Sequence, residues 1–351
     1  MTSTWRPPSG GRCWCAVPAA PPTTSGPRVS CRIPPASGSR FGSTRWRGGS
    51  CPESSRENEM SETKPKLIVV GVDGSDDGLR AVKYGASYAA EIGGELLLVH
   101  AVDDAMLAGA WGVVYDPEVL QNAGVTANEA AAAIARECGL PDERIRTEVV
   151  LGSPGGVLGR LSEVADLIIV GRRSTSGLER MFVGSTSVSV VAGSSCPVLV
   201  ISAAAHPQDV GHKGLIGVGL NTSPGNRSTL IAGFEEAAQW GAKLEIVHAL
   251  QPPIGLFGPK LGPADLDELI RFTRGGIEAM AAEQAKAFPK VDYEVVVVAA
   301  TPINELVTRS ESYDILVLGT GEEAIPGFGL GGLLRGLMAH ALCPLHITHG
   351  Q

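Results

Sequence analysis

Residues 170–200 read VGRRSTSGLERMFVGSTSVSVVAGSSCPVLV, and this stretch decides the fold. It starts at the end of an apolar run, Leu167 to Val170, which is typical of a strand buried inside a parallel sheet. A loop rich in Gly, Ser and Arg follows, then a helix-sized segment from Gly184, then a second apolar run after Pro197. The order strand, loop, helix, strand predicts an α/β protein.

The same stretch carries the residue types of an anion site. Backbone N–H groups at a helix N-terminus carry partial positive charge and favour phosphate. Gly171 and Gly184 allow the backbone to approach a ligand closely, and Ser185 adds a hydroxyl donor. Ordinary connections between strands and helices use glycines too, so the loop by itself leaves both interpretations open.

Length and charge narrow the class of protein. A chain of 351 residues with 44% hydrophobic residues is long enough for two domains with sizeable cores. The net charge of −8 argues against a nucleic-acid partner, and no apolar run reaches the roughly 18 residues that cross a bilayer. The cysteines show neither zinc-site spacing nor a disulfide framework. We therefore expect a cytoplasmic protein that has no membrane partner.

Residues 1–59 differ from the rest of the chain. They contain four of the seven cysteines, three of the five tryptophans and no lysine, and they show no helical or strand periodicity. Such a composition predicts disorder. Met60 begins MSETKPKLIVVGVDGS directly before the first apolar strand. We therefore interpret 1–59 as a disordered or mis-assigned extension that carries no functional weight.

From Lys66 onward, apolar runs and helical segments alternate regularly. Turn residues such as Gly71-Val72-Asp73-Gly74-Ser75 separate them and cap the helices. Short joints between alternating strands and helices predict a parallel sheet covered on both faces. The first expected strands span 67–72, 95–102 and 145–151, and the first expected helices span 76–92, 117–138 and 153–164.

The pattern starts again after a short polar joint. Equivalent residues are 148 positions apart at eight landmarks, and the offset falls to 147 at Cys196-Pro197 against Cys343-Pro344. One register held over so many positions indicates a tandem duplication. We expect a first repeat over 60–205, a linker over 206–213 and a second repeat over 214–351. The eight pairs are Gly71/Gly219, Asp73/Asn221, Ser75/Ser223, His100/His248, Pro154/Pro302, Asp166/Asp314, Gly171/Gly319 and Gly184/Gly332.

Together the landmarks resemble the universal stress protein family in its tandem two-domain form. The family hallmark is Gly, two residues, Gly, nine residues, Gly, then Ser or Thr. Here it reads Gly171-Arg172-Arg173-Ser174, nine residues, then Gly184-Ser185. The motifs VGVDGS, LLLVHAV, GSPGGVL and CPVLVI support the resemblance, which covers roughly residues 64–350.

The resemblance implies both a fold and a ligand. Each repeat is expected to be a doubly wound parallel sheet of five strands, Rossmann-like and of the adenine nucleotide alpha hydrolase-like type. ATP, with or without Mg²⁺, is expected at the carboxyl ends of the strands, where open α/β sheets bind ligands. The implied nucleotide-binding residues are Gly71, Asp73, Ala101, Val170, Gly171, Ser174, Gly184, Ser185 and Thr186, and Asp73 is also the expected metal ligand.

The implied roles follow the nucleotide from base to phosphate. Ala101 matches a backbone contact to the base, and Asp73 matches an acidic residue beside the nucleotide. Val170 and Gly171 match the floor under the ribose and the α-phosphate. The segment 184–186 matches the backbone and hydroxyl donors to the β- and γ-phosphates.

Several positions depart from the family pattern. Ser174 occupies the position of the second Gly in the hallmark. If the backbone there needs a positive φ, a serine is strained by about 1–2 kcal/mol. If the position needs only a small residue, the serine hydroxyl adds a hydrogen-bond donor to the site. In the second repeat, Asn221 stands in place of the acidic residue and Leu333 stands in place of the serine, so the carboxylate and the hydroxyl are both absent. Glu322 places a carboxylate in register with Ser174. Because like charges repel, we expect the second site to be degenerate.

Two pairs of residues invite other interpretations. His100 and His248 recur in register inside apolar strands, which favours hydrogen-bonded core histidines over catalytic ones. Arg172 and Arg173 either reach a phosphate or remain solvated loop charges.

The sequence therefore predicts an ATP-binding protein of stress response or regulation that acts through nucleotide occupancy. No positioned general base is evident, so we expect slow hydrolysis at most. The alternative is an interaction scaffold that has lost nucleotide binding, which the substitution at Ser174 favours. We expect the two repeats to pack as an intramolecular pseudo-dimer, and the resemblance implies further association into a homodimer.

Overall fold

The computed structural model describes residues 65–103, 116–172, 183–201, 213–221, 226–251, 262–320 and 330–350. All of these belong to one compact unit, Glu62–Gln351. The expected extension over 1–59, Arg173, Ser174 and Glu322 lie outside the described residues.

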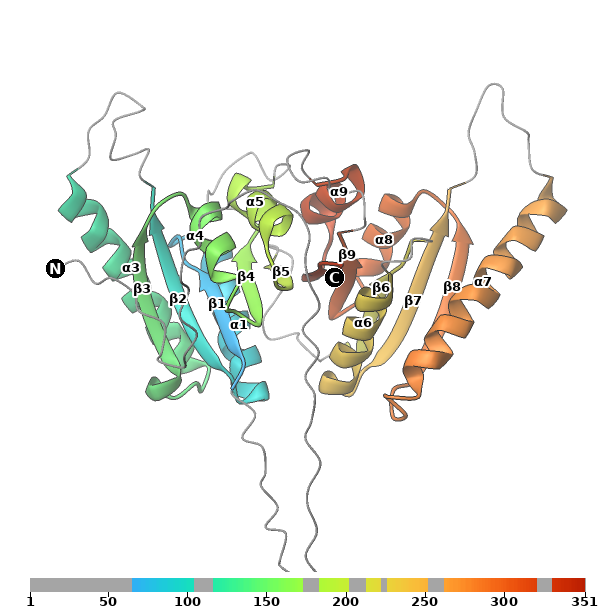
Figure 1. Ribbon diagram of the computed structural model, residues 1–351, viewed down its shortest axis with the longest axis horizontal. Helices are drawn as coiled ribbons and strands as arrows, with labels where there is room; N and C mark the ends of the chain where they lie inside the picture. The colour runs from blue at the N-terminus through green and yellow to red at the C-terminus, as the bar shows by residue number, and fades with distance from the viewer. Residues whose placement is uncertain are drawn as a thin grey trace, which may run out of the picture. The chain divides into compact units, whose positions relative to one another are not determined.

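Each repeat alternates strands and helices (Figure 1). The first repeat contains β1 (Leu67–Gly71), α1 (Asp76–Ile92), β2 (Glu95–Val102), α3 (Pro117–Glu137), the short 3-10 helix η1 (Asp142–Arg144), β3 (Ile145–Leu151), α4 (Pro154–Leu161), β4 (Leu167–Gly171), α5 (Ser185–Gly193) and β5 (Val198–Ile201). The second repeat contains β6 (Leu215–Gly219), α6 (Asn226–Trp240), β7 (Lys243–Leu250), α7 (Pro263–Ala285), β8 (Tyr293–Ala299), α8 (Pro302–Ser310), β9 (Ile315–Gly319), α9 (Gly332–His340) and β10 (Leu345–Thr348).

The strands of both repeats form one sheet in the order β3-β2-β1-β4-β5-β10-β9-β6-β7-β8. Neighbouring strands are parallel within each repeat, which confirms the expected fold class. The repeats join where β5 and β10 pair in the antiparallel direction, with Leu199 opposite His346. These two residues hold equivalent positions, 147 apart, so a pseudo-twofold axis passes between them.

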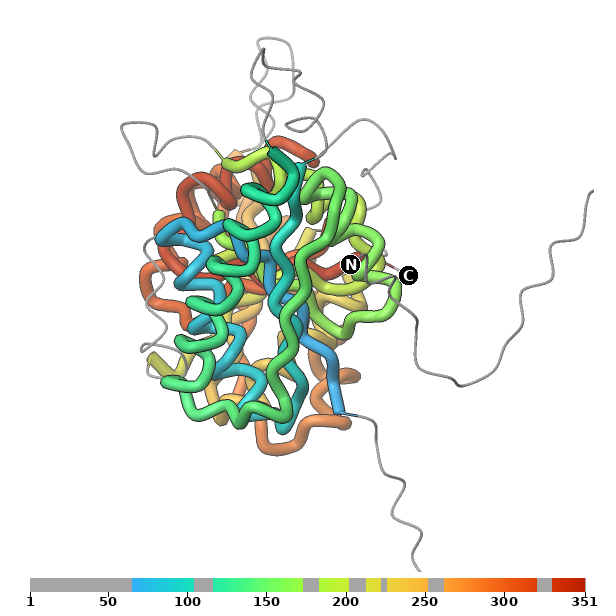
Figure 2. Tube along the Cα trace, turned by 90° about the vertical axis from the view of Figure 1, so that its left-hand side faces the viewer, coloured from blue at the N-terminus to red at the C-terminus, as the bar shows by residue number. Residues whose placement is uncertain are grey.

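Helices cover both faces of the sheet (Figures 1 and 2). α1, α3, α6 and α7 pack on one face, and α4, α5, α8 and α9 pack on the other. Every inner strand therefore buries side chains on both sides. In β1, Ile68 and Val70 lie in one core cluster and Val69 lies in the other. This double burial is the physical reason that the strands read as continuous apolar runs.

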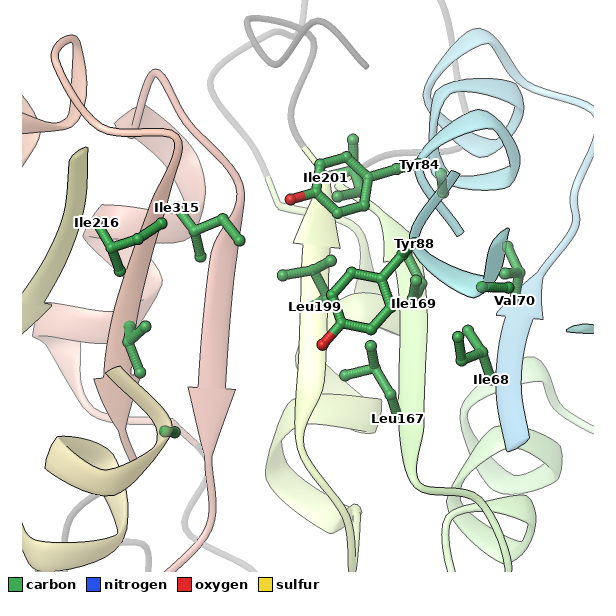
Figure 3. Close-up of a cluster of buried hydrophobic side chains, with 14 of the residues drawn as sticks. Ile68, Val70, Tyr84, Tyr88, Leu167, Ile169, Leu199, Ile201, Ile216 and Ile315 are labelled. Atoms are coloured by element: carbon green, nitrogen blue, oxygen red, sulfur yellow. The ribbon is translucent and has the colours of Figure 1, made fainter. Parts of the chain in front are cut away.

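The core on the α1 and α6 face continues across the join between the repeats (Figure 3). Tyr84 and Tyr88 project from α1 over β5, beside Leu199 and Ile201. Ile216 of β6 belongs to the same buried cluster. Burying one such side chain contributes about 1.5–3 kcal/mol, so this shared core helps to hold the two repeats together.

Burial also sets the reactivity of the thiols. Cys196 and Cys343 are buried, and burial raises the pKa of both thiols, that of Cys343 to about 12. Cys138, at the end of α3, is partly exposed. Because the thiolate is the reactive form, we predict that iodoacetamide at about pH 8 modifies Cys138 well before the other two. Peptide mass spectrometry of the folded chain measures this order, and equal rates at Cys138 and Cys343 would contradict it.

Candidate functional site

A cleft lies at the carboxyl ends of β1, β2 and β4 in the first repeat. It contains about 770 Å³ of unfilled space, part of which is open to solvent. The cavity volume within this space is about 190 Å³. All of the sequence-predicted site residues that the structure describes line this cleft, namely Gly71, Asp73, Ala101, Val170, Gly171, Gly184, Ser185 and Thr186.

The N-terminus of α5 forms one end of the cleft. Gly184 is its N-cap, and no side chain among the described residues caps the helix. The Gly184 amide donates to Arg172 O (3.0 Å), and Ser187 Oγ donates to Gly171 O (2.8 Å), which fixes the helix against the end of β4. The amides of the first turn and the hydroxyls of Ser185 and Thr186 therefore border the cleft, where the helix dipole favours an anion.

The N-terminus of α1 also borders the cleft, but it is capped by a side chain and carries acidic residues. Ser75 Oγ accepts from the Gly78 amide (3.0 Å) and so caps the helix. Asp76 and Asp77 add negative charge to the first turn. Of these two helix ends, only α5 therefore offers a favourable environment for phosphate.

Asp73 places a carboxylate at the edge of the cleft. Its Oδ1 accepts from both the amide (3.0 Å) and the hydroxyl (2.6 Å) of Ser75, which orients the side chain. A methyl group on Gly78 would lie 2.3 Å from the same oxygen, so a larger residue there would displace the Asp73 carboxylate. Among the described residues no group of three or more His, Cys, Asp or Glu side chains could hold a metal ion. A cation here would need phosphate oxygens as its main ligands, with Asp73 adding one more.

Gly171 is required by packing. A Cβ at this position would lie 2.7 Å from the carbonyl carbon of Asp77 and 2.9 Å from the Gly78 nitrogen. The backbone at the end of β4 therefore touches the start of α1. Gly184, in contrast, has an extended backbone with φ of −62°, which any residue can adopt.

Sequence reasoning missed several residues of the cleft. His100 was expected in the core, yet it is half-buried and lines the cleft, with Nδ1 2.9 Å from Val72 O. His248 does match the expectation, because it is buried with Nδ1 2.8 Å from Leu220 O. The other missed lining residues are Val72, Gly78, Val99, Pro154, Leu158 and Ser187. Their apolar or small side chains gave no chemical signal, although Pro154 lies in the GSPGGVL landmark.

Arg172 makes a contact with the second repeat that the sequence did not predict. Its Nη1 donates to Ala339 O (2.8 Å) in the last turn of α9. A cation at a helix C-terminus is stabilised by the helix dipole. The side chain therefore ties the loop after β4 to the second repeat.

The equivalent region of the second repeat is built differently. A Cβ on Gly319 would lie 2.5 Å from Thr229 Oγ1, which in turn bonds Thr348 Oγ1 (2.9 Å). Asn221 replaces the carboxylate, and its backbone oxygen accepts from Asn226 Nδ2. Leu333 stands in the first turn of α9 at the position of Ser185. The described residues of this region thus lack the acid and the hydroxyl of the first repeat.

Comparison with known proteins agrees with this architecture. The sequence model of the universal stress protein family matches the chain twice, over residues 65–202 and 215–349. The chain therefore belongs to the universal stress protein family and carries two of its domains in tandem.

Individual relatives cover between about two fifths and four fifths of the chain. Universal stress protein Rv2005c of Mycobacterium tuberculosis is 29% identical over 80% of this chain and 96% of its own length. Universal stress protein MJ0531 of Methanocaldococcus jannaschii is 33% identical over 39% of this chain and 81% of its own. A universal stress protein structure from Archaeoglobus fulgidus shares the fold with a TM-score of 0.59 at 16% identity, covering 81% of this chain and 98% of its own.

Proposed function

We propose that the first repeat binds one adenine nucleotide, ATP, in the cleft at the ends of β1, β2 and β4, and that occupancy of this cleft regulates the protein. The observation that carries the proposal is the uncapped N-terminus of α5, which borders the same cleft as Asp73 and Ala101. Membership of the family supports adenine nucleotide as the ligand class, as the sequence motifs implied.

Each part of the cleft suits one part of such a ligand. The amides at the start of α5 and the hydroxyls of Ser185 and Thr186 are donors for phosphate oxygens. The apolar surface of Val72 and Val99 suits a planar base, next to the backbone of Ala101. The other carboxylate oxygen of Asp73, Oδ2, can accept a hydrogen bond from a ribose hydroxyl or coordinate a Mg²⁺ ion that the phosphates hold.

The described residues favour binding over rapid turnover. Asp73 is the carboxylate that lines the cleft, and one of its oxygens is occupied by Ser75. A fast hydrolase needs a base that orients the attacking water beside the γ-phosphate. We therefore propose slow hydrolysis at most, so that ATP acts by favouring one state of the protein.

The stress-related role, the cytoplasmic location and the homodimer remain predictions from the sequence. In the part of the chain that the structure describes, no helix combines the length and hydropathy of a bilayer-spanning segment.

Substitution of Asp73 tests the proposed site against its counterpart. We expect Asp73→Ala to weaken ATP binding by about 10- to 100-fold, because hydrogen bonds to a charged group contribute roughly 1.5–3 kcal/mol. Asn221→Ala, 148 residues later, is the matched control and is expected to change affinity by less than about twofold. Isothermal titration of the full-length variants measures both. Equal losses would mean that both repeats bind, and no heat with the wild type at millimolar ATP would favour the scaffold alternative.

A further inference from the structure

A second cavity lies where the two repeats meet, away from the nucleotide cleft. It contains about 600 Å³ of unfilled space, part of it open to solvent, between the amino ends of the first-repeat strands and helix α6. Ile68, Leu167, Pro197 and Ala232 form apolar walls. The cavity volume within this space is about 140 Å³, close to the roughly 150 Å³ of an apolar cavity that holds benzene.

A buried polar cluster forms one side of this cavity. Glu236 is 3% exposed and accepts from His346 Nδ1 (2.7 Å), Trp240 Nε1 (2.9 Å) and, at the longer distance of 3.4 Å, Tyr88 Oη. The carboxylate is thus satisfied from three directions. Because a carboxylate only accepts, the Nδ1 atom of His346 carries a proton, and the hydrogen-bonding capacity of the ring that remains is at Nε2.

Two residues that line the cavity each have a buried side-chain nitrogen without a hydrogen-bond partner. His346 is 7% exposed, and its Nε2 is buried with no hydrogen-bond partner. Gln239 Nε2 is also buried without a hydrogen bond of normal geometry, and the Gln239 side chain lies near the Tyr88 hydroxyl. A buried polar atom without a partner costs roughly 1–3 kcal/mol, so a ligand that bonds to these atoms would recover that cost.

The pseudo-twofold axis shows what fits in such a space. Ala232 lies 148 residues after Tyr84, so a tyrosine stands in one repeat where the other has only a methyl group. Tyr84 is 1% exposed and shares a core cluster with Ile216 and Ile315 of the second repeat. Figure 3 shows it projecting from α1 across β5. The space beside Ala232 is therefore the counterpart of the space that the Tyr84 ring fills.

The surroundings of Tyr84 support this equivalence. Burial raises the pKa of its hydroxyl well above the ordinary value, and Glu236, Cys343 and Asp314 add to the rise. Asp314 is the counterpart of Asp166, which lines the cavity. The tyrosine and the cavity thus occupy matching places on the two sides of the axis.

We propose that this cavity is a second ligand site, which takes a small neutral molecule with a phenol ring. The ring replaces the missing tyrosine against the apolar walls. Its hydroxyl can donate or accept, so it satisfies His346 Nε2 in either protonation state of that nitrogen and can accept from Gln239. A carboxylate would instead meet three acidic residues of the lining, Asp166, Glu235 and Glu236, which outnumber its one basic residue, Lys66.

The test uses 4-methylphenol, which is the side chain of tyrosine as a free molecule, and the full-length protein. Ligand-observed NMR and titration calorimetry are expected to give a dissociation constant of about 1 mM or tighter, unaffected by saturating ATP. Ala232→Tyr is expected to abolish binding and to raise the melting temperature, because the new ring fills the space. Ala238→Tyr, on the exposed side of the same helix, is the matched control and is expected to keep binding.

A second variant tests the polar part and does not depend on the folding of the first. His346→Leu restores the residue type of its counterpart, Leu199, and is expected to lower affinity for 4-methylphenol about 10-fold without changing the affinity for toluene. Absence of binding to the wild type at about 10 mM, or unchanged binding to Ala232→Tyr, would overturn the proposal. Equal binding of toluene and 4-methylphenol would overturn the role of the buried nitrogens. Failure of ATP binding leaves these results intact, since the two cavities share no lining residue.

Discussion

Ser185→Glu is expected to lower the affinity for ATP at least about 100-fold while leaving the fold intact. The new carboxylate would stand in the first turn of α5, where the proposed site places phosphate. Two like charges about 4 Å apart repel by about 4 kcal/mol at an effective dielectric constant of 20, and screening by salt reduces this. The same carboxylate stabilises the helix by about 0.3–1 kcal/mol, because acidic residues suit a helix N-terminus.

The second repeat supplies the control for this substitution. Leu333 occupies the position of Ser185, 148 residues later, and is partly exposed in the first turn of α9. Leu333→Glu adds the same charge at the same place in the fold, and we expect ATP affinity to stay within about twofold of the wild type. Calorimetry gives the affinities and thermal melting gives the stabilities. Comparable losses in both variants, or none in Ser185→Glu, would contradict the phosphate site at α5.

The largest expected effect on stability concerns a pair of residues in the second repeat. Gly217 lies beneath the buried ring of Tyr313, and a Cβ there would stand 2.4 Å from a ring carbon. We expect Gly217→Val to cost about 3 kcal/mol by overpacking, and Tyr313→Ala to cost about 3–5 kcal/mol by leaving a cavity. Urea denaturation of the full-length variants measures both values.

The double variant is expected to cost much less than the sum of the two. The first repeat has Val69 and Ala165 at the equivalent positions, so Gly217→Val with Tyr313→Ala recreates its packing. The recovery is incomplete, because Tyr313 also donates to buried Glu245, which would lose this bond and keep the one from Arg309 Nη1 (2.8 Å). We expect a coupling energy of about 2 kcal/mol or more. Strict additivity would contradict the proposed compensation.

Much of the fold followed from local patterns. The strand over 95–102 and the helix over 76–92 were predicted with the bounds that the structure has, because apolar runs, Ser75 and Gly93 mark their ends clearly. The helix expected over 153–164 ends at Leu161, after which single-turn hydrogen bonds continue to Ala165. Such turns have the same sequence character as a helix end.

The site residues that could be predicted from their side-chain chemistry alone are those with a charged or hydroxyl group. Asp73 and Ser185 could be placed at one edge of the sheet because the carboxyl ends of parallel strands meet there. The bond from Arg172 to Ala339 could not, because it depends on how the repeats join, and only the pairing of β5 with β10 fixes that geometry. The cavity beside Ala232 could not be predicted either, because an alanine in a helix does not by itself indicate empty space. The space becomes evident only when Ala232 is compared with its counterpart, Tyr84.

The central claim is that one repeat holds the nucleotide and the other does not. A crystal structure of the full-length protein grown with a non-hydrolysable ATP analogue tests it directly. We predict one nucleotide for each chain, with the phosphates at the start of α5 and the base beside Ala101. A nucleotide at α9, nucleotides in both repeats, or phosphates directed away from Gly184 would contradict the account.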